Sequence, residues 1–333
     1  MAHNLTSVDY FLFCQIPPGE GTISNMSRPW TPENVITTEN ASNAISDQFP
    51  QLRPVFAKPL GTGWDNSAFL VNEILVFRFP RRQVALDLLN TERLLLPKIA
   101  DKLPIPVPRP QYFGQPGEYF PWCFSGYLYL PGVSACSFTW GEEQRQRLTR
   151  PLAKFLAALH AISTQEAPKW GIGPDRFDKL NFSERLPLLE KNLETLLRLN
   201  LIRDLRPLLA IAEEGAPPLR LESVVVHGDL YARHLIVDST GNLSGIIDWG
   251  DAHLADPATD LSVAHLLLPP TQLHDFRRHY GEISEARWKL SRLRALSHAS
   301  VISNYGYEIQ DHQLLNAGTI SLDYIGRGFQ GSV

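Results

Sequence analysis

Two aspartates, each close behind a short apolar run, and a histidine between them are the residues of this sequence best suited to chemistry. Asp229 comes shortly after the valines at 224–226, and Asp248 directly follows two isoleucines. Because a buried strand fixes the residues that come after it, we expect both carboxylates at one rigid place. His234 lies five positions after Asp229 (234 − 229) and Asp248 nineteen (248 − 229), nearly the spacing of the base and metal ligands in the protein-kinase catalytic loop. This spacing predicts phosphoryl transfer, in which one carboxylate takes a hydroxyl proton and the other groups hold a divalent metal ion.

Two successive sets of elements have to position these side chains. Short antiparallel strands with one following helix come first, and a mostly helical part that carries the β-rich catalytic segment comes second. The order predicts an α+β, protein-kinase-like fold of two lobes, with the nucleotide between them. Residues 1–30 are expected to be an N-terminal extension, 31–131 a nucleotide-binding lobe and 132–333 a catalytic and acceptor-binding lobe. The predicted helices cover residues 31–48, 83–100, 141–163, 184–212 and 284–303, and the predicted strands cover 55–60, 67–71, 74–79, 122–130, 223–226, 235–237 and 245–247.

Composition and charge argue against several classes of protein. The chain has 333 residues, 44 % hydrophobic and 20 % charged, which is typical of a folded, soluble protein. Its net charge of −4 provides no basic excess for nucleic-acid phosphates. Three cysteines at no metal-ligand spacing favour neither a disulfide framework nor a structural zinc site. We therefore expect a cytoplasmic protein that binds small molecules and neither nucleic acid nor a membrane.

The catalytic segment contains a recognisable series of short motifs. His-Gly-Asp-Leu stands at 227–230, Ile-Asp-Trp at 247–249 and Asp-Pro-x-x-Asp-Leu at 256–261. In order and spacing the series resembles the signature of the aminoglycoside phosphotransferase and choline-kinase-like enzymes. The resemblance extends over about residues 31–310. It implies ATP or GTP as the phosphoryl donor, Mg²⁺ as the metal and a small molecule as the acceptor.

The same resemblance implies a role for individual residues. Asp229 corresponds to the catalytic base, Asp248 to the main metal ligand and Asp260 to a structural brace of the loop. His234 stands where most of the family has Asn, a variation similar to the macrolide phosphotransferase branch. An imidazole nitrogen is a softer ligand than an amide oxygen and favours Mn²⁺ relative to the Asn form. The alternative for His234 is a packed side chain bonded to backbone, and we expect His227 to hold the loop in that way.

The first lobe contains candidate nucleotide-binding residues. Gly61 and Gly63 lie between two predicted strands and resemble the family's nucleotide loop, in which backbone amides approach phosphate oxygens. The alternative is a hairpin that needs glycine only for a positive φ. Arg78 stands where the family usually has a phosphate-contacting Lys, and Glu92 on the following helix is its expected ion-pair partner.

Two further segments flank these residues. The run from Tyr127 to Leu130 is expected to form the hinge beside the nucleotide base. Arg81 and Arg82 are interpreted as solvated surface arginines, because paired arginines after a strand usually extend into water.

These observations predict a small-molecule kinase with Asp229 as base. The expected acceptor is an antibiotic-like hydroxyl compound, a macrolide first and an aminoglycoside second, which would make the protein an antibiotic-resistance enzyme. Choline, homoserine or a sugar amine are alternative acceptors, and a metal-dependent hydrolase or a non-catalytic nucleotide-binding module are alternatives of another class. The macrolide expectation rests on His234 and on aromatic residues that line either an apolar pocket or plain core, namely Trp288, Tyr305, Tyr307 and Tyr324.

Overall fold

The computed structural model describes residues 31–218 and 220–330, and these form two compact units. The predicted N-terminal extension of residues 1–30 lies outside the described residues. The lobe boundary predicted after residue 131 stays a prediction. Of the described residues, the first unit contains those up to Arg93 together with Arg109–Tyr129 and Arg176–Asp178, and the second contains Leu94–Pro108, Leu130–Asp175 and those from Lys179 onward.

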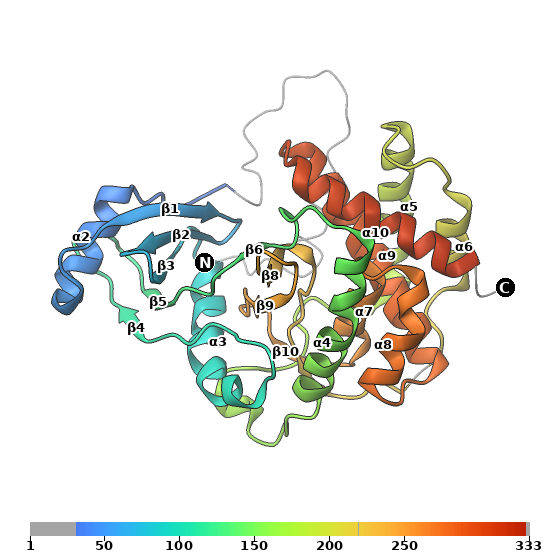
Figure 1. Ribbon diagram of the computed structural model, residues 1–333, viewed down its shortest axis with the longest axis horizontal. Coiled ribbons are helices and arrows are strands. Elements are labelled where there is room, and N and C mark those ends of the chain that lie inside the picture. The colour runs from blue at the N-terminus through green and yellow to red at the C-terminus, as the bar shows by residue number, and fades with distance from the viewer. Residues whose placement is uncertain (1–30, 219, 331–333) are drawn as a thin grey trace, which may run out of the picture. The chain divides into compact units, whose positions relative to one another are not determined.

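A five-stranded antiparallel sheet is the centre of the first unit (Figure 1). Its strand order is β1-β2-β3-β5-β4, so that β3 lies in the middle and pairs with both β2 and β5. All six residues of β3 are buried, as expected of a strand covered on both faces. The strands are β1 (Ala57–Thr62), β2 (Asn66–Val71), β3 (Leu75–Pro80), β4 (Tyr112–Gly114) and β5 (Phe124–Leu128).

Aromatic side chains fill the core on one face of this sheet. Phe79 of β3 stacks on Phe124 of β5 with 4.5 Å between the ring centroids. Helix α2 (Thr38–Gln48) contributes buried Ala41 and Ile45 to the same cluster. Because successive side chains of a strand point to opposite faces, this packing directs Arg78 away from the aromatic core.

The first helix is shorter than the sequence predicts. A helix was expected over residues 31–48, but α2 begins at Thr38. Thr37 caps it, since its hydroxyl accepts a hydrogen bond at 3.1 Å from the backbone N–H three residues later. The backbone N–H of Glu33 donates instead to the carbonyl oxygen of Arg81 at 2.8 Å. That hydrogen bond ties the segment before α2 to the residue that follows β3, and it outweighs the helix-start signal in the sequence near residue 31.

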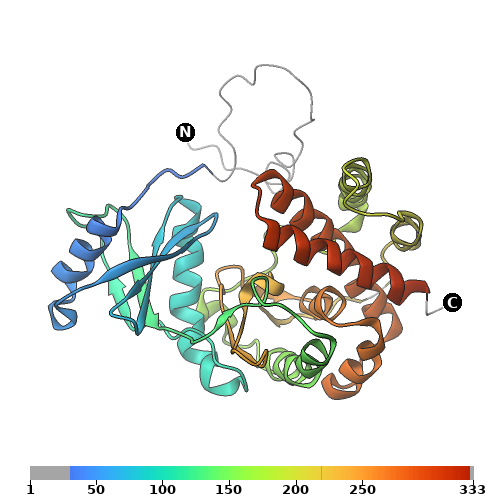
Figure 2. The ribbon, with the colours of Figure 1, turned by 45° about the horizontal axis from the view of Figure 1, so that its top comes forward.

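Helices form most of the second unit. Helix α9 (Glu285–Glu308) packs along both α10 (His312–Gln330) and α7 (Ala258–Leu267), as Figures 1 and 2 show. Every residue of α7 is buried, so its sequence has no polar face and no helical period by which it could have been predicted. The other helices are α3 (Val84–Ile99), which continues from the first unit, α4 (Glu142–His160), α5 (Phe182–Arg198), α6 (Arg206–Glu214) and α8 (Leu273–Tyr280).

Two small sheets stand among these helices. β7 (Val224–Val226) pairs with β10 (His253–Ala255), and β8 (Leu235–Val237) lies between β6 (Val133–Ser134) and β9 (Leu243–Ile246). Fully buried Trp249, in the loop after β9, packs against Phe155 of α4. The expected α+β class is confirmed, and the loops between these short strands carry the candidate site.

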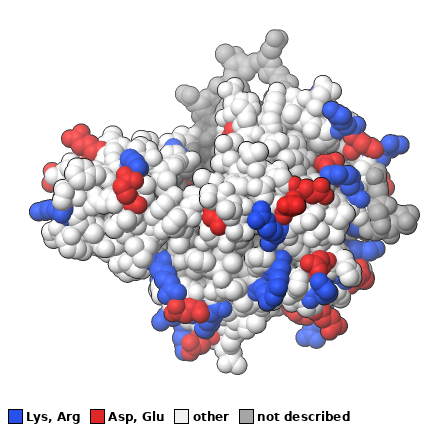
Figure 3. All heavy atoms as spheres, in the orientation of Figure 1, with Lys and Arg blue, Asp and Glu red and all other residues white. Residues whose placement is uncertain are grey.

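No helix within residues 31–218 and 220–330 is long and apolar enough to cross a bilayer. On the face shown in Figure 3, the charged residues of both signs are interspersed.

Candidate active site

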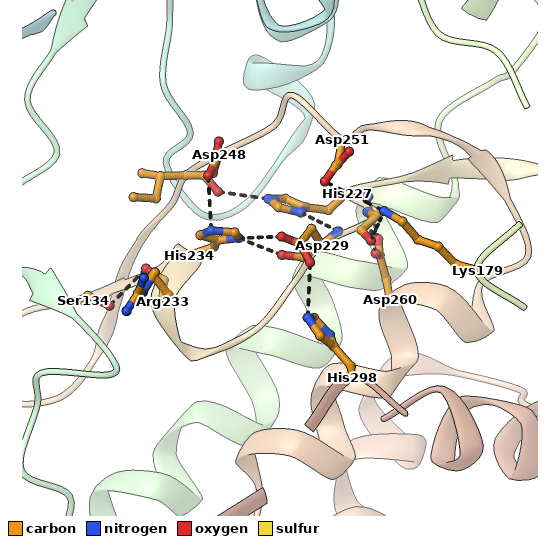
Figure 4. Close-up of polar contacts among 12 residues, drawn as sticks. Ser134, Lys179, His227, Asp229, Arg233, His234, Asp248, Asp251, Asp260 and His298 are labelled. Carbon is orange, nitrogen blue, oxygen red and sulfur yellow. Dashed lines mark hydrogen bonds and ion pairs between the residues drawn. The ribbon is translucent and has the colours of Figure 1, made fainter. Parts of the chain in front are cut away.

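The loop that follows β7 is held by one buried carboxylate. Oδ2 of Asp260, on α7, accepts a hydrogen bond from the backbone N–H of His227 at 2.7 Å, and Oδ1 accepts one from Gly228 at 2.9 Å. Hydrogen bonds to a charged acceptor are among the stronger ones in proteins, and here two of them fix consecutive peptide groups. Asp229 is the next residue, and its position is therefore set by the core (Figure 4). The predicted role of Asp260 as a brace of this loop is confirmed.

His227 connects the two loops that carry the aspartates. It is fully buried, and burial lowers the pKa of its imidazole, so that the ring is neutral. Its Nε2–H donates to the carbonyl oxygen of Ile247 at 3.0 Å, while Nδ1 accepts from the backbone N–H of Asp229 at 3.3 Å. The expected structural role of His227 is confirmed, because both ring nitrogens bond to backbone.

His234 lies between the two aspartates. Its Nδ1–H donates to the backbone carbonyl of Asp229 at 2.7 Å, which leaves Nε2 facing Oδ2 of Asp248 at 3.2 Å. Burial alone would lower the pKa of His234, but the neighbouring Asp248 and Asp229 carboxylates outweigh it and raise that pKa. Asp248 itself has a φ of 66°, a left-handed conformation that aims its side chain towards His234. The structure thus brings Asp229, His234 and Asp248 together, as the spacing predicted.

This arrangement suits a divalent ion that arrives with its nucleotide. The backbone bond at Nδ1 fixes the ring orientation and keeps Nε2 of His234 directed at the Asp248 carboxylate. Among the described residues, no three His, Cys, Asp or Glu side chains form a complete metal cluster. A nucleotide-bound Mg²⁺ needs only one or two protein ligands, since phosphate oxygens and water supply the rest. One imidazole nitrogen and one carboxylate fit that requirement.

Two residues far away in the sequence complete the surroundings of Asp229. Nε2 of His298, on α9, lies 3.2 Å from Oδ1 of Asp229. The ammonium of Lys179 donates to the carbonyl of Gly228 at 2.9 Å and lies 3.9 Å from Oδ2 of Asp251. Burial would raise the pKa of Asp229, but His298, His234 and Lys179 together hold it well below its usual range. Sequence reasoning missed His298 and Lys179, because neither stands in a motif or at a local spacing from Asp229.

In the first unit, Arg78 and Glu92 form the ion pair that the sequence predicted. Nη1 of Arg78, on β3, lies 2.6 Å from Oε1 of Glu92 on α3, and both residues are buried. A buried charge pair is strong only with good geometry and further hydrogen bonds. The pair fixes the guanidinium on the sheet face opposite the aromatic core.

The glycine loop has a geometry that the hairpin alternative does not explain. Neither Gly61 nor Gly63 is among the glycines with a positive φ. A Cβ built on Gly61 would meet no atom within 4 Å, and one on Gly63 would only reach a carbonyl at 3.9 Å. Positive φ and internal packing therefore do not require glycine here, and the absent side chains leave space beside the peptide backbone.

The paired arginines hold this loop. Nη1 of Arg81 donates to the carbonyl of Gly63 at 2.6 Å, and Arg82, which is buried, pairs with Asp65. The interpretation of these arginines as solvated is wrong for Arg82, because the loop folds back and supplies a carboxylate partner.

The expected hinge residues lie at the end of β5 and just beyond it. Tyr127 is buried and pairs with Val76 of β3. Leu130 is half-buried, and its side chain packs against Gly245, where a Cβ would come within 3.0 Å. Contact of Tyr127 or Leu130 with a nucleotide base stays a prediction.

Comparison with known proteins identifies the family. The model of the phosphotransferase enzyme family matches residues 57–296. The chain is 29 % identical over 66 residues to the uncharacterized protein YcbJ of Bacillus subtilis (strain 168). That match covers 20 % of this chain and 22 % of YcbJ, so the chain spans about a fifth of the length of that curated relative.

Solved structures agree in fold. The GDP complex of wild-type aminoglycoside 2'-phosphotransferase-IIIa has a TM-score of 0.65 at 24 % identity, with 89 % of this chain and 100 % of that chain covered. Macrolide 2'-phosphotransferase type I has a TM-score of 0.54 at 21 % identity, with 87 % and 98 % covered. MphH, a macrolide 2'-phosphotransferase of Brachybacterium faecium, has a TM-score of 0.51 at 20 % identity, with 80 % and 91 % covered. With its kinase-like fold and a family match over most of its length, the chain belongs to the phosphotransferase enzyme family and is a phosphotransferase.

Proposed function

We propose that this phosphotransferase transfers the γ-phosphoryl group of ATP or GTP to a hydroxyl group of a small, antibiotic-like molecule. The observation that carries the proposal is the position of His234, which donates to the Asp229 backbone and faces the Asp248 carboxylate. The buried His234 ring thereby connects Asp229, which is suited to a hydroxyl acceptor, with Asp248, which together with His234 is suited to the metal ion of the nucleotide.

Asp229 serves as the base in this reaction. It orients the acceptor hydroxyl towards the γ-phosphorus and takes its proton as the new O–P bond forms. In the loose transition state of phosphoryl transfer the proton leaves late, so positioning counts for more than basicity. The hydrogen bond from His298 and the nearby ammonium of Lys179 support this role because they stabilise a carboxylate in one place.

His234 and Asp248 would hold Mg²⁺ or Mn²⁺. When bound, the ion neutralises charge between the β- and γ-phosphates. In the first unit we assign Arg78, held by Glu92, to the nucleotide phosphates. The absence of side chains at Gly61 and Gly63 leaves room for the same phosphates to approach the loop, and the N–H of Gly63 already donates to the carbonyl of Asn66 at 2.9 Å.

For the acceptor we propose a macrolide first and an aminoglycoside second. The neighbours support both classes: two are macrolide 2'-phosphotransferases, and another is a phosphotransferase solved with GDP and kanamycin. The aromatic residues support an apolar acceptor only in part. Trp288 is half-buried and packs against core residue Phe276, whereas Tyr305 lies two turns beyond His298 on the same helix. Choline, homoserine and sugar amines remain alternative acceptors. Family membership favours phosphoryl transfer over metal-dependent hydrolysis.

The test is a mass-spectrometric screen. The purified protein is incubated with ATP and GTP, Mg²⁺ or Mn²⁺, and a panel of macrolides, aminoglycosides and small amino alcohols. We expect one acceptor class to gain the mass of one phosphoryl group.

The matched variants are Asp229→Asn, which removes the base without changing the shape of the side chain, and Asp323→Asn, which alters an exposed carboxylate of α10. The mass gain should disappear with the first and persist with the second. Full turnover by Asp229→Asn would refute the assignment of the base. Nucleotide binding without any transfer to the panel would favour the non-catalytic module.

A further inference from the structure

His298 stands out because it touches Asp229 from a helix that belongs to no recognised motif. It lies on α9, is 8 % exposed, and places Nε2 3.2 Å from Oδ1 of Asp229. Its other nitrogen, Nδ1, has no hydrogen-bond partner among the described residues. In the close-up, His298 approaches Asp229 from below, whereas His234 lies to its left and Asp248 above His234 (Figure 4).

The surroundings of His298 fix both its protonation state and its orientation. Burial and the guanidinium of Arg294, one turn earlier on α9, lower the pKa of His298 to about 4, so the ring is neutral near pH 7. With Nδ1 unpartnered, the proton lies on Nε2, which donates to the carboxylate. Tyr231 packs its ring edge-on against the imidazole with 5.1 Å between centroids. The imidazole is thus a neutral donor, held in one orientation.

The two oxygens of Asp229 are consequently not equivalent. Oδ1 accepts the His298 hydrogen bond, whereas Oδ2 lies 3.7 Å from Nδ1 of His234, a nitrogen whose proton is already donated to a backbone carbonyl. A carboxylate bonded at one oxygen cannot rotate freely about its Cβ–Cγ bond. The oxygen that remains available is therefore the same one in each catalytic cycle.

We propose that His298 is a positioning residue, whose Nε2–H holds Oδ1 of Asp229 so that Oδ2 is the oxygen presented to the acceptor hydroxyl. The inference rests on the proposed function. In the step it serves, the acceptor O–H bond breaks and its proton passes to Oδ2, the acceptor oxygen forms the bond to the γ-phosphorus, and the nucleoside diphosphate leaves with the electron pair of the broken P–O bond. The proton on Oδ2 then returns to water. His298 neither gains nor loses a proton.

Three substitutions separate positioning from packing. His298→Phe keeps a ring of similar size against Tyr231 and removes the donor. His298→Gln keeps an N–H at nearly the distance of Nε2, and His298→Asn has an amide that is one methylene too short. We expect His298→Phe and His298→Asn to lower kcat by about 10- to 100-fold, with KM for the nucleotide within about twofold of the unaltered enzyme. His298→Gln should recover most of the lost kcat.

The measurements are steady-state kinetics on the full chain with the acceptor found in the screen, together with circular dichroism and thermal melting. Unchanged kcat in a folded His298→Phe or His298→Asn enzyme overturns the proposal. Equal loss of kcat in His298→Gln and His298→Asn also overturns it, because a packing role does not depend on how far the side-chain N–H extends towards Oδ1 of Asp229. If one variant does not fold, the contrast among the others gives the decision. Asp229→Asn distinguishes failure of the proposed function from failure of the positioning role. If Asp229→Asn retains turnover, the proposed function fails. If Asp229→Asn is inactive while His298→Phe is fully active, only the positioning role of His298 is refuted.

Discussion

Gly228 offers the sharpest perturbation of the catalytic loop that substitutes none of the proposed functional side chains. Its φ is +85°, and a Cβ there would lie 2.4 Å from the backbone carbonyl oxygen of Asp251 and 2.8 Å from Nδ1 of His253. A left-handed conformation destabilises alanine by about 1–2 kcal/mol relative to glycine. Relief of the contact needs a shift of about 1 Å in a backbone atom, and overpacking of that kind adds about 1–3 kcal/mol.

Gly215 is the matched control for this substitution. It also has a positive φ, +64°, but a Cβ there would meet nothing within 4 Å. Gly215→Ala therefore carries only a conformational term, which at its ψ of −171° is about 1–3 kcal/mol, whereas Gly228→Ala carries both a conformational term and the clash. In a folding unit of about 200 residues, 1 kcal/mol shifts the melting temperature by about 2–4 °C, so we expect it to fall by roughly 6 °C for Gly215→Ala and by roughly 10 °C for Gly228→Ala.

Activity should separate the two variants further. Displacement of Asp229 by about 1 Å lowers kcat on the order of 100-fold, while KM for the nucleotide changes little. Gly215→Ala should retain full kcat. Melting followed by circular dichroism and kinetics with the identified acceptor measure both effects. The reasoning is wrong if Gly228→Ala melts together with Gly215→Ala or turns over at the unaltered rate, since either result means that the loop is not confined as the structure shows.

Three further outcomes follow from other parts of the chain. Glu92→Gln removes the charged partner of buried Arg78 and should lower the free energy of unfolding in urea by about 3 kcal/mol. Glu73→Gln breaks an exposed ion pair with Lys58 and should lower it by less than about 1 kcal/mol, so equal effects would contradict the importance of burial. Burial lowers the pKa of His265 to about 3, so between about pH 6.5 and 3 the unfolded chain binds a proton that the folded chain does not. His265 should therefore lower stability as pH falls through that window, by up to about 1.4 kcal/mol per pH unit, and His265→Gln should flatten the pH dependence of unfolding; an unchanged slope would exclude this contribution. His234→Asn exchanges a nitrogen donor for an amide oxygen and should lower the ratio of kcat/KM with Mn²⁺ to that with Mg²⁺ several-fold, while an unchanged ratio would remove His234 from the metal.

Local sequence was sufficient for the centre of the site. Asp229, His234 and Asp248 are separated by short strands and tight turns, so the path of the chain leaves them few relative positions. For the same reason the Arg78–Glu92 pair was predictable, since one strand leads directly into one helix. Where the backbone between two residues is short and regular, spacing carries three-dimensional information.

Other local signals were misleading or silent. The helix-start signal near residue 31 was overruled by a backbone bond to Arg81, and the burial of Arg82 depended on Asp65 folding back towards it. Helix α7 gave no periodic signal because all its faces are covered. In each case the deciding partner comes from another element, and its distance along the chain hides it from any local pattern.

The sequence by itself determined the family, the phosphoryl-transfer motifs and the residues that meet at the loop after β7, because these depend on short-range connections. Only the tertiary structure decided which groups surround Asp229. His298 reaches it from α9, and Lys179 supports the carbonyl beside it. A lone histidine on a buried helix has no distinguishing sequence environment. Its significance comes from the packing of α9 against the catalytic loop, which brings an N–H donor to one oxygen of the proposed base.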